Sequence, residues 1–193
     1  MARARAAAEK SKATRLDAAA WVTAAFDALA DGGIDAMRVE PLAKALGITK
    51  GSFYWHFADR RALLDAMLDA WMQGRFAAIR EQAPLRGAPA AVLRQLADLY
   101  TRNANARGLA IELAIRALAR TDEGAAKAVR SVDRERLQQV GDLFTALGWP
   151  RGEAQARAVL FYSYLFGQSL LDPQAVPAAA RDIAVDALLA TPP

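Results

Sequence analysis

Residues 38–57 read RVEPLAKALGITKGSFYWHF. The apolar residues of this stretch recur at spacings of three and four on either side of Gly47, which is typical of two short amphipathic helices. Gly47 supplies the permissive backbone that a tight turn needs. The inner face is formed by Leu42, Ala43, Leu46, Ile48, Phe53 and Phe57. We therefore predict a helix over about 39–46 and another over about 49–55, together a helix-turn-helix.

In the second helix of this motif, the polar side chains and two aromatic side chains are expected to face solvent. They are Thr49, Lys50, Ser52, Tyr54, Trp55 and His56. In a helix-turn-helix the second helix lies in the major groove of DNA, with its polar face toward bases and phosphates. Gly51 lowers helix propensity by about 1 kcal/mol relative to alanine, a loss that makes sense if DNA backbone approaches closely there.

The rest of the chain also has helical periodicity, with glycine and proline between the segments. We predict an all-α fold. Asp17 is expected to cap a first helix that ends at Asp31, and Asp59 is expected to cap a long fourth helix that ends near Pro84. Further helices are predicted at about 89–104, 108–120, 122–147, 152–171 and 178–190.

Composition removes several classes of function. The chain has no cysteine and one histidine, so disulfides, thiolate nucleophiles and cysteine metal sites are absent, and little remains for another transition-metal site. We expect no catalytic residues, no metal and no cofactor. No apolar run approaches the roughly 20 residues needed to cross a bilayer, and no apolar signal segment follows the basic start. The expected location is the cytoplasm, without a membrane.

Positive charge is concentrated at the beginning of the chain. Residues 1–15 contain Arg3, Arg5, Lys10, Lys12 and Arg15 against one glutamate, and thus carry the whole formal net charge of +4. Local positive charge of this kind displaces counterions from phosphates. The segment is either a disordered solubilising arm or an arm that enters a DNA groove.

The stretch LAKALGITKGSFYWHFADRRALLDAM, residues 42–67, resembles the signature of the TetR family of bacterial regulators. The resemblance is strongest from about residue 14 to 74. It implies that Thr49, Lys50 and Ser52 touch base edges and nearby phosphates, with Lys50 a donor to guanine O6 or N7. It also implies a role for the side chains that follow. Phosphate contacts are expected from Tyr54, His56 and Arg60, while Trp55 flanks the groove.

Two residues depart from the family pattern. Arg38 stands where the family usually has threonine, and Pro41 lies in the first turn of the helix, where proline is tolerated. Arg38 is expected to contact phosphate. Glu40 would repel phosphate unless it accepts a hydrogen bond from cytosine N4, which makes it a specificity candidate. Alternatively, Tyr54 and Trp55 pack at a domain seam and His56 is simply solvated.

The resemblance also implies a domain organisation and partners. We expect a basic disordered arm over 1–13, a DNA-binding domain over 14–74 with its motif at 37–57, and an α-helical ligand-binding and dimerisation domain over 75–193. The expected partners are double-stranded palindromic operator DNA, a second copy of the chain in a homodimer, and an unknown small-molecule effector. The implied function is a transcription regulator, a repressor that its ligand releases.

The stretch GLAIELAIRALA, residues 108–119, is apolar nearly all round except at Glu112 and Arg116. These two form an ion pair at spacing four, or they line an inducer pocket. Further pocket candidates are Trp71, Tyr100, Asn103 and Phe144. A helical enzyme with Glu112 as base, and a regulator governed by a protein partner, are the alternative functions.

A broad face of the helix at about 152–171 is expected to form the dimer interface or, alternatively, an intrachain core. Its residues are Ala154, Ala158, Phe161, Tyr162, Leu165, Phe166 and Ser169. The last helix adds Ile183, Ala184, Ala187 and Leu188. Dimerisation is favoured because a two-fold protein matches a palindromic operator.

Overall fold

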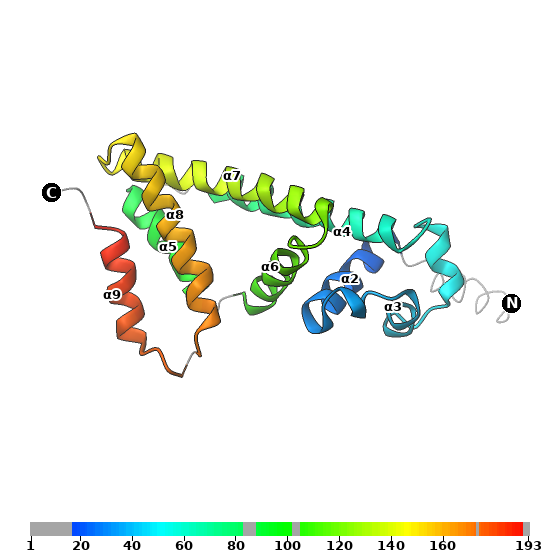
Figure 1. Ribbon diagram of the computed structural model, residues 1–193. Helices are drawn as coiled ribbons and strands as arrows, with labels where there is room; N and C mark the ends of the chain where they lie inside the picture. The colour runs from blue at the N-terminus through cyan, green and yellow to red at the C-terminus, as the bar shows by residue number, and fades with distance from the viewer. Residues whose placement is uncertain (1–16, 83–87, 102–104, 173, 191–193) are drawn as a thin grey trace, which may run out of the picture. The chain divides into compact units, whose positions relative to one another are not determined.

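The computed structural model describes residues 17–82, 88–101, 105–172 and 174–190, and within them it has helices and loops but no strand (Figure 1). The predicted all-α class is confirmed. The chain forms two compact units. Unit 1 comprises Met1–Gln73 and Ala110–Val129, and unit 2 comprises Gly74–Leu109 and Arg130–Pro193. The basic arm over 1–13 and Asn103 lie outside the described residues.

Unit 1 begins with helix α2 (Ala18–Gly32), followed by the short 3-10 helix η1 (Ile34–Ala36) and then α3 (Val39–Ala45). The predicted cap at Asp17 is confirmed, because its Oδ1 accepts from the Ala20 N–H at 3.0 Å. Trp21, Ala25 and Leu29 are buried along one face of α2, as their spacing of four predicts. This face supports the helix-turn-helix, since α2 packs against α3.

Helix α4 (Arg60–Gln82) starts at the second predicted cap. Asp59 Oδ1 accepts from the Ala62 N–H at 2.8 Å. In the part of α4 that belongs to unit 1, the apolar stripe is buried as the periodicity predicts. Its members are Leu63, Leu64, Met67, Leu68 and Trp71.

The helix that follows the turn is a 3-10 helix, η2 (Lys50–Trp55), rather than the predicted α-helix. Its hydrogen bonds follow the tighter pattern, in which the His56 N–H donates to the Phe53 carbonyl at 3.0 Å. The segment is only six residues long and has Gly51 as its second residue, and both features weaken an α-helix.

Unit 2 contains α5 (Pro89–Thr101), α8 (Arg151–Gly167), η3 (Gln168–Leu170) and α9 (Ala178–Leu188). Its core is one cluster of buried residues, to which α5, α8 and α9 all contribute. Two more helices, α6 (Ala106–Leu118) and α7 (Glu123–Ala146), are divided between the units. The helices predicted over 89–190 are therefore all present, with ends shifted by a few residues.

Membrane-spanning helices and clusters of metal ligands are both absent from the described residues. No helix in those ranges is long and apolar enough to cross a bilayer. Likewise, the part of the chain that the structure describes contains no group of three or more histidine, aspartate or glutamate side chains that could hold a metal ion.

Candidate nucleic-acid interface

The turn between α3 and η2 has the geometry that the sequence predicts. Gly47 has a φ of 68°, in the left-handed region that favours glycine. Just after it, the Ile48 N–H donates to the Ala43 carbonyl at 3.0 Å and so closes the turn onto α3. Leu42 and Ala43 are buried, so α3 is held by its inner face.

The short helix η2 is anchored by a single aromatic side chain. Phe53 is fully buried, and its ring meets Trp21 of α2 edge-on with 5.2 Å between centroids. On the outside, Tyr54 is 57% exposed and Trp55 is 80% exposed. Tyr54 and Trp55 therefore form an aromatic surface that faces solvent, on the same helix that begins with Lys50.

Lys50 forms an ion pair with Glu40, which lies in the first turn of α3. The hydrogen bond from Lys50 lowers the pKa of the Glu40 carboxyl, and the Glu40 carboxylate raises the pKa of the Lys50 ammonium. Both groups are therefore charged near neutral pH. Thr49 and His56 flank this face and are exposed, whereas Ser52 is half-buried and its hydroxyl donates to the Thr49 carbonyl at 3.0 Å.

Two arginines border the motif. Arg38 occupies the N-cap position of α3, and its side chain makes no capping hydrogen bond, as expected where arginine replaces threonine. It is exposed. Arg60, at the start of α4, donates from Nη2 to the Ile34 carbonyl. A guanidinium has five N–H donors, so this bond fixes Arg60 without using its capacity for a phosphate.

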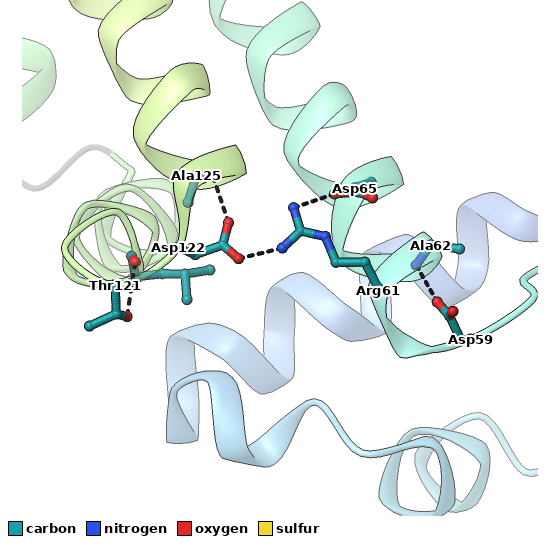
Figure 2. Close-up of polar contacts among 8 residues, drawn as sticks. Asp59, Arg61, Ala62, Asp65, Thr121, Asp122 and Ala125 are labelled. Atoms are coloured by element: carbon teal, nitrogen blue, oxygen red, sulfur yellow. Dashed lines mark hydrogen bonds and ion pairs between the residues drawn. The ribbon is translucent and has the colours of Figure 1, made fainter.

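A second polar cluster lies where α4 and α7 begin, within unit 1 (Figure 2). The Arg61 guanidinium points between two carboxylates and pairs with Asp65 on its own helix and with Asp122. Asp122 also caps α7, because its Oδ1 accepts from the Ala125 N–H at 2.8 Å. Burial raises the pKa of Asp122, but the Ala125 N–H and the Arg61 charge outweigh burial, so the pKa lies below its ordinary value.

This geometry predicts different effects for two substitutions of Asp122. Asp122→Ala removes the cap and the ion pair and should lower the free energy of unfolding of unit 1 by about 1–2 kcal/mol. Asp122→Asn keeps a good cap and should cost less. Urea unfolding at pH 7 measures both. Equal losses for the two variants would contradict separate roles for the cap and the pair.

The same pair predicts a pH dependence. A carboxyl whose pKa is lowered by folding contributes stability above its unfolded pKa of about 4 and loses it as the pH falls through the lowered folded value. The advantage of the wild type over Asp122→Asn should therefore shrink on acidification below about pH 4.

The ligand-pocket candidates divide between the two units. In unit 1, the Arg116 Nε donates to the Glu112 Oε1 at 2.9 Å, which confirms the predicted pair, and Glu112 is buried. Trp71 is also buried, and its indole N–H has no acceptor among the described residues. In unit 2, Tyr100 meets Phe166 edge-on, and Phe144 is fully buried against Phe161.

For five of the seven residues on the α8 face, the expected dimer interface is wrong, because they are buried within their own chain, as the alternative expectation had it. Ala154, Ala158, Phe161, Tyr162 and Leu165 all belong to the core of unit 2. An amphipathic stripe buries its apolar side against whatever lies nearest, and here α5 and α9 cover it. On other sides of these helices Val159, Leu160 and Ile183 are more than half exposed.

Two of the charged contacts that the sequence did not predict involve the proposed interface and the core of unit 2. One is the Lys50–Glu40 pair, whose members lie on different helices ten positions apart. The other is Arg136 on α7, which is buried and lies over the rings of Tyr162 and Phe166, 5.9 and 5.8 Å from their centroids. Arg136 stands four residues from both Val132 and Val140, which are fully buried. That spacing was an available signal for its burial.

Comparison with known proteins agrees with this geometry. Residues 22–67 match the sequence model of the bacterial regulatory proteins of the tetR family. Tetracycline repressor protein class A from transposon 1721 of Escherichia coli is 39% identical over 59 residues, which are 31% of this chain and 27% of that protein. Class D of Escherichia coli is 42% identical over 53 residues, 28% of this chain and 24% of that protein. The chain therefore aligns with about a quarter of the length of these curated relatives.

Solved structures share the fold over most of the chain. A transcriptional regulator from Rhodococcus sp. Rha1 superposes with a TM-score of 0.75 at 22% identity, covering 90% of this chain and 94% of that one. The ketosteroid transcriptional regulator KstR2 of Mycobacterium tuberculosis has a TM-score of 0.64 at 16% identity, with 91% and 95% covered. At these identities the likeness concerns the fold.

The fold and the exposed η2 define an all-α protein with a helix-turn-helix near its N-terminus. The matched residues 22–67 include α3, η2 and the start of α4, the elements that present Lys50, Tyr54 and Arg60. Residues 22–67 are thus similar to the bacterial regulatory proteins of the tetR family.

Proposed function

We propose that this chain is a DNA-binding transcription regulator that acts as a homodimer on a palindromic operator and is released by a small-molecule ligand. The observation that carries the proposal is the arrangement of η2. Phe53 is buried while Lys50, Tyr54 and Trp55 face solvent, and a helix-turn-helix presents the residues that touch DNA in this way.

Individual roles follow from position on this surface. Base edges are assigned to Thr49, Lys50 and Ser52, and phosphates to Arg38, Tyr54, His56 and Arg60, with Trp55 at the groove edge. The absence of a side chain at Gly51 would let a DNA backbone approach η2 closely. A Cβ there would lie 3.8 Å from Thr49 Oγ1, an ordinary contact, and the position has no positive φ. The fold itself therefore does not require glycine at this position, and a DNA backbone is a reason for it.

For the domains, we propose that residues 14–74 bind DNA and that residues 75–193 bind the ligand and dimerise. A second copy is proposed to pack on the exposed apolar side chains of α8 and α9, namely Val159, Leu160 and Ile183. Large apolar side chains that stay exposed mark interaction surfaces when they form a contiguous patch. A two-fold axis through such a surface gives the symmetry of a palindrome.

The effector is proposed to be a small organic molecule. The relatives are named for such molecules, tetracycline in one case and a ketosteroid in the other. The Trp71 indole N–H, buried without an acceptor among the described residues, can donate to a polar atom of a ligand. The proposed ligand contacts are Trp71, Glu112 and Arg116 in unit 1 and Tyr100 and Phe144 in unit 2, while Asn103, also a candidate, lies outside the described residues.

The test is binding to DNA selected by the protein from fragments of its own genome. We expect a palindromic site bound about a thousandfold more tightly than random DNA at moderate salt. Tyr54→Ala should weaken both by a similar factor, about five- to tenfold, because a phosphate contact carries no sequence information. Fluorescence anisotropy measures both affinities. A wild-type protein without preference for any palindrome would refute the regulator function.

A further inference from the structure

The ion pair between Lys50 and Glu40 lies on the outer surface of the helix-turn-helix. The side chain of Lys50 is 51% exposed and that of Glu40 is 63% exposed, so neither charge is buried. Ion pairs this exposed contribute little to folding. The main consequence of the pair is therefore the charge that the motif presents to a partner.

Pairing cancels the charge of the cation at the start of η2. A free lysine adds to affinity for any DNA, because each neutralised phosphate releases a condensed counterion. A lysine held by a carboxylate adds no net charge, and the carboxylate repels phosphate oxygens. The hydrogen bond from Lys50 lowers the pKa of Glu40, so the carboxylate stays charged at the pH of DNA binding.

We propose that Glu40 is a positioning residue for DNA specificity. Its carboxylate holds the Lys50 ammonium away from phosphates, and Lys50 leaves the ion pair only when it binds the edge of a base. The inference rests on the proposed DNA-binding function. Guanine offers two acceptors, O6 and N7, on one edge in the major groove, and lysine binds this edge preferentially. Phosphates occur at every step of the duplex, so the pair suppresses the contact that carries no sequence information.

The consequence is measurable on the full-length protein with Glu40→Gln, which keeps the size of the side chain and removes its charge. Affinity for random DNA should rise about fivefold, while affinity for the selected operator changes by less than about twofold. The plot of log affinity for random DNA against log salt should steepen by about 0.9, the increment for one additional phosphate contact. A purely structural role for Glu40 would leave this slope unchanged.

The same substitution in a Lys50→Ala background shows whether Glu40 acts through Lys50 or repels phosphates directly. If Glu40 acts through Lys50, Glu40→Gln should have little effect there on random-DNA affinity. Asp69→Asn, which removes an exposed carboxylate on α4, is the matched control for loss of charge alone and should leave specificity unchanged.

Three results would overturn the inference. The first is an equal gain in random-DNA affinity from Glu40→Gln with and without Lys50. The second is an equal gain in random-DNA affinity from Asp69→Asn. The third is that Glu40→Gln weakens operator binding in a way that depends on one G·C pair and does not raise affinity for random DNA. The last would mean that Glu40 reads cytosine directly. Failure of the DNA-binding function itself is distinct, because it appears as a wild-type protein with no operator preference.

Discussion

Replacing Phe53 by alanine will lower the free energy of unfolding of unit 1 by about 3–5 kcal/mol, the usual range for truncating a fully buried phenylalanine. Phe53 is 0% exposed and meets the rings of Trp21, Tyr54 and Phe57 at centroid distances of 5.2, 5.2 and 5.5 Å. It is the buried residue of η2, and a six-residue 3-10 helix has few hydrogen bonds of its own to hold it.

Loss of this anchor should also lower operator affinity more than tenfold, because Lys50 and Tyr54 would no longer be held in one geometry. Thermal unfolding followed by circular dichroism and anisotropy with operator DNA measure the two effects. Trp55→Ala is the control for stability: its side chain is 80% exposed, and its removal should change the unfolding free energy by less than about 0.5 kcal/mol. An unchanged transition for Phe53→Ala would show that η2 is held by something else.

Local chemistry made much of unit 1 predictable from the sequence. Asp17 and Asp59 cap their helices because a short carboxylate before a helix accepts from its free N–H groups, a rule that needs no tertiary information. Gly47 has the left-handed backbone that its place between two amphipathic helices requires. Because Phe53 is buried on one side of η2, Tyr54 and Trp55 are exposed on the other, and this too could be predicted from the sequence.

Contacts between different helices were harder to predict from the sequence. Glu40 meets Lys50 only because the turn at Gly47 brings the first turn of α3 to the start of η2, and no spacing rule encodes that meeting. The 3-10 form of η2 was also missed, because periodicity does not separate short helices of the two types. For Arg136, the spacing of four from buried valines indicates burial, but it does not identify the two aromatic rings that the side chain covers.

The face of α8 illustrates a more general limit. Its apolar stripe was readable, but a stripe does not say whether its cover comes from the same chain or from a second copy. Phe161 and Leu165 are covered by their own chain. The exposed apolar residues Val159 and Leu160 follow directly on Ala158, so a shift of one position separates the core from the proposed interface.

Leu160→Arg is expected to convert the proposed dimer into a monomer and to reduce operator affinity about a hundredfold or more. The side chain is 58% exposed in the isolated chain, so arginine can be accommodated without loss of the core. In a dimer that buries this surface, two guanidiniums related by the two-fold axis would be desolvated without partners. A monomer also loses the effective concentration by which one bound half-site promotes binding of the other.

Sedimentation equilibrium and anisotropy on a full palindrome test this prediction together. Leu99→Arg is the matched control, because Leu99 is an exposed leucine on α5 of the same unit and the substitution adds the same charge. Leu99→Arg should remain a dimer with normal operator affinity. If Leu160→Arg also stays dimeric, the interface lies elsewhere. If it becomes monomeric but keeps full affinity for the palindrome, dimerisation is not what matches the protein to its operator.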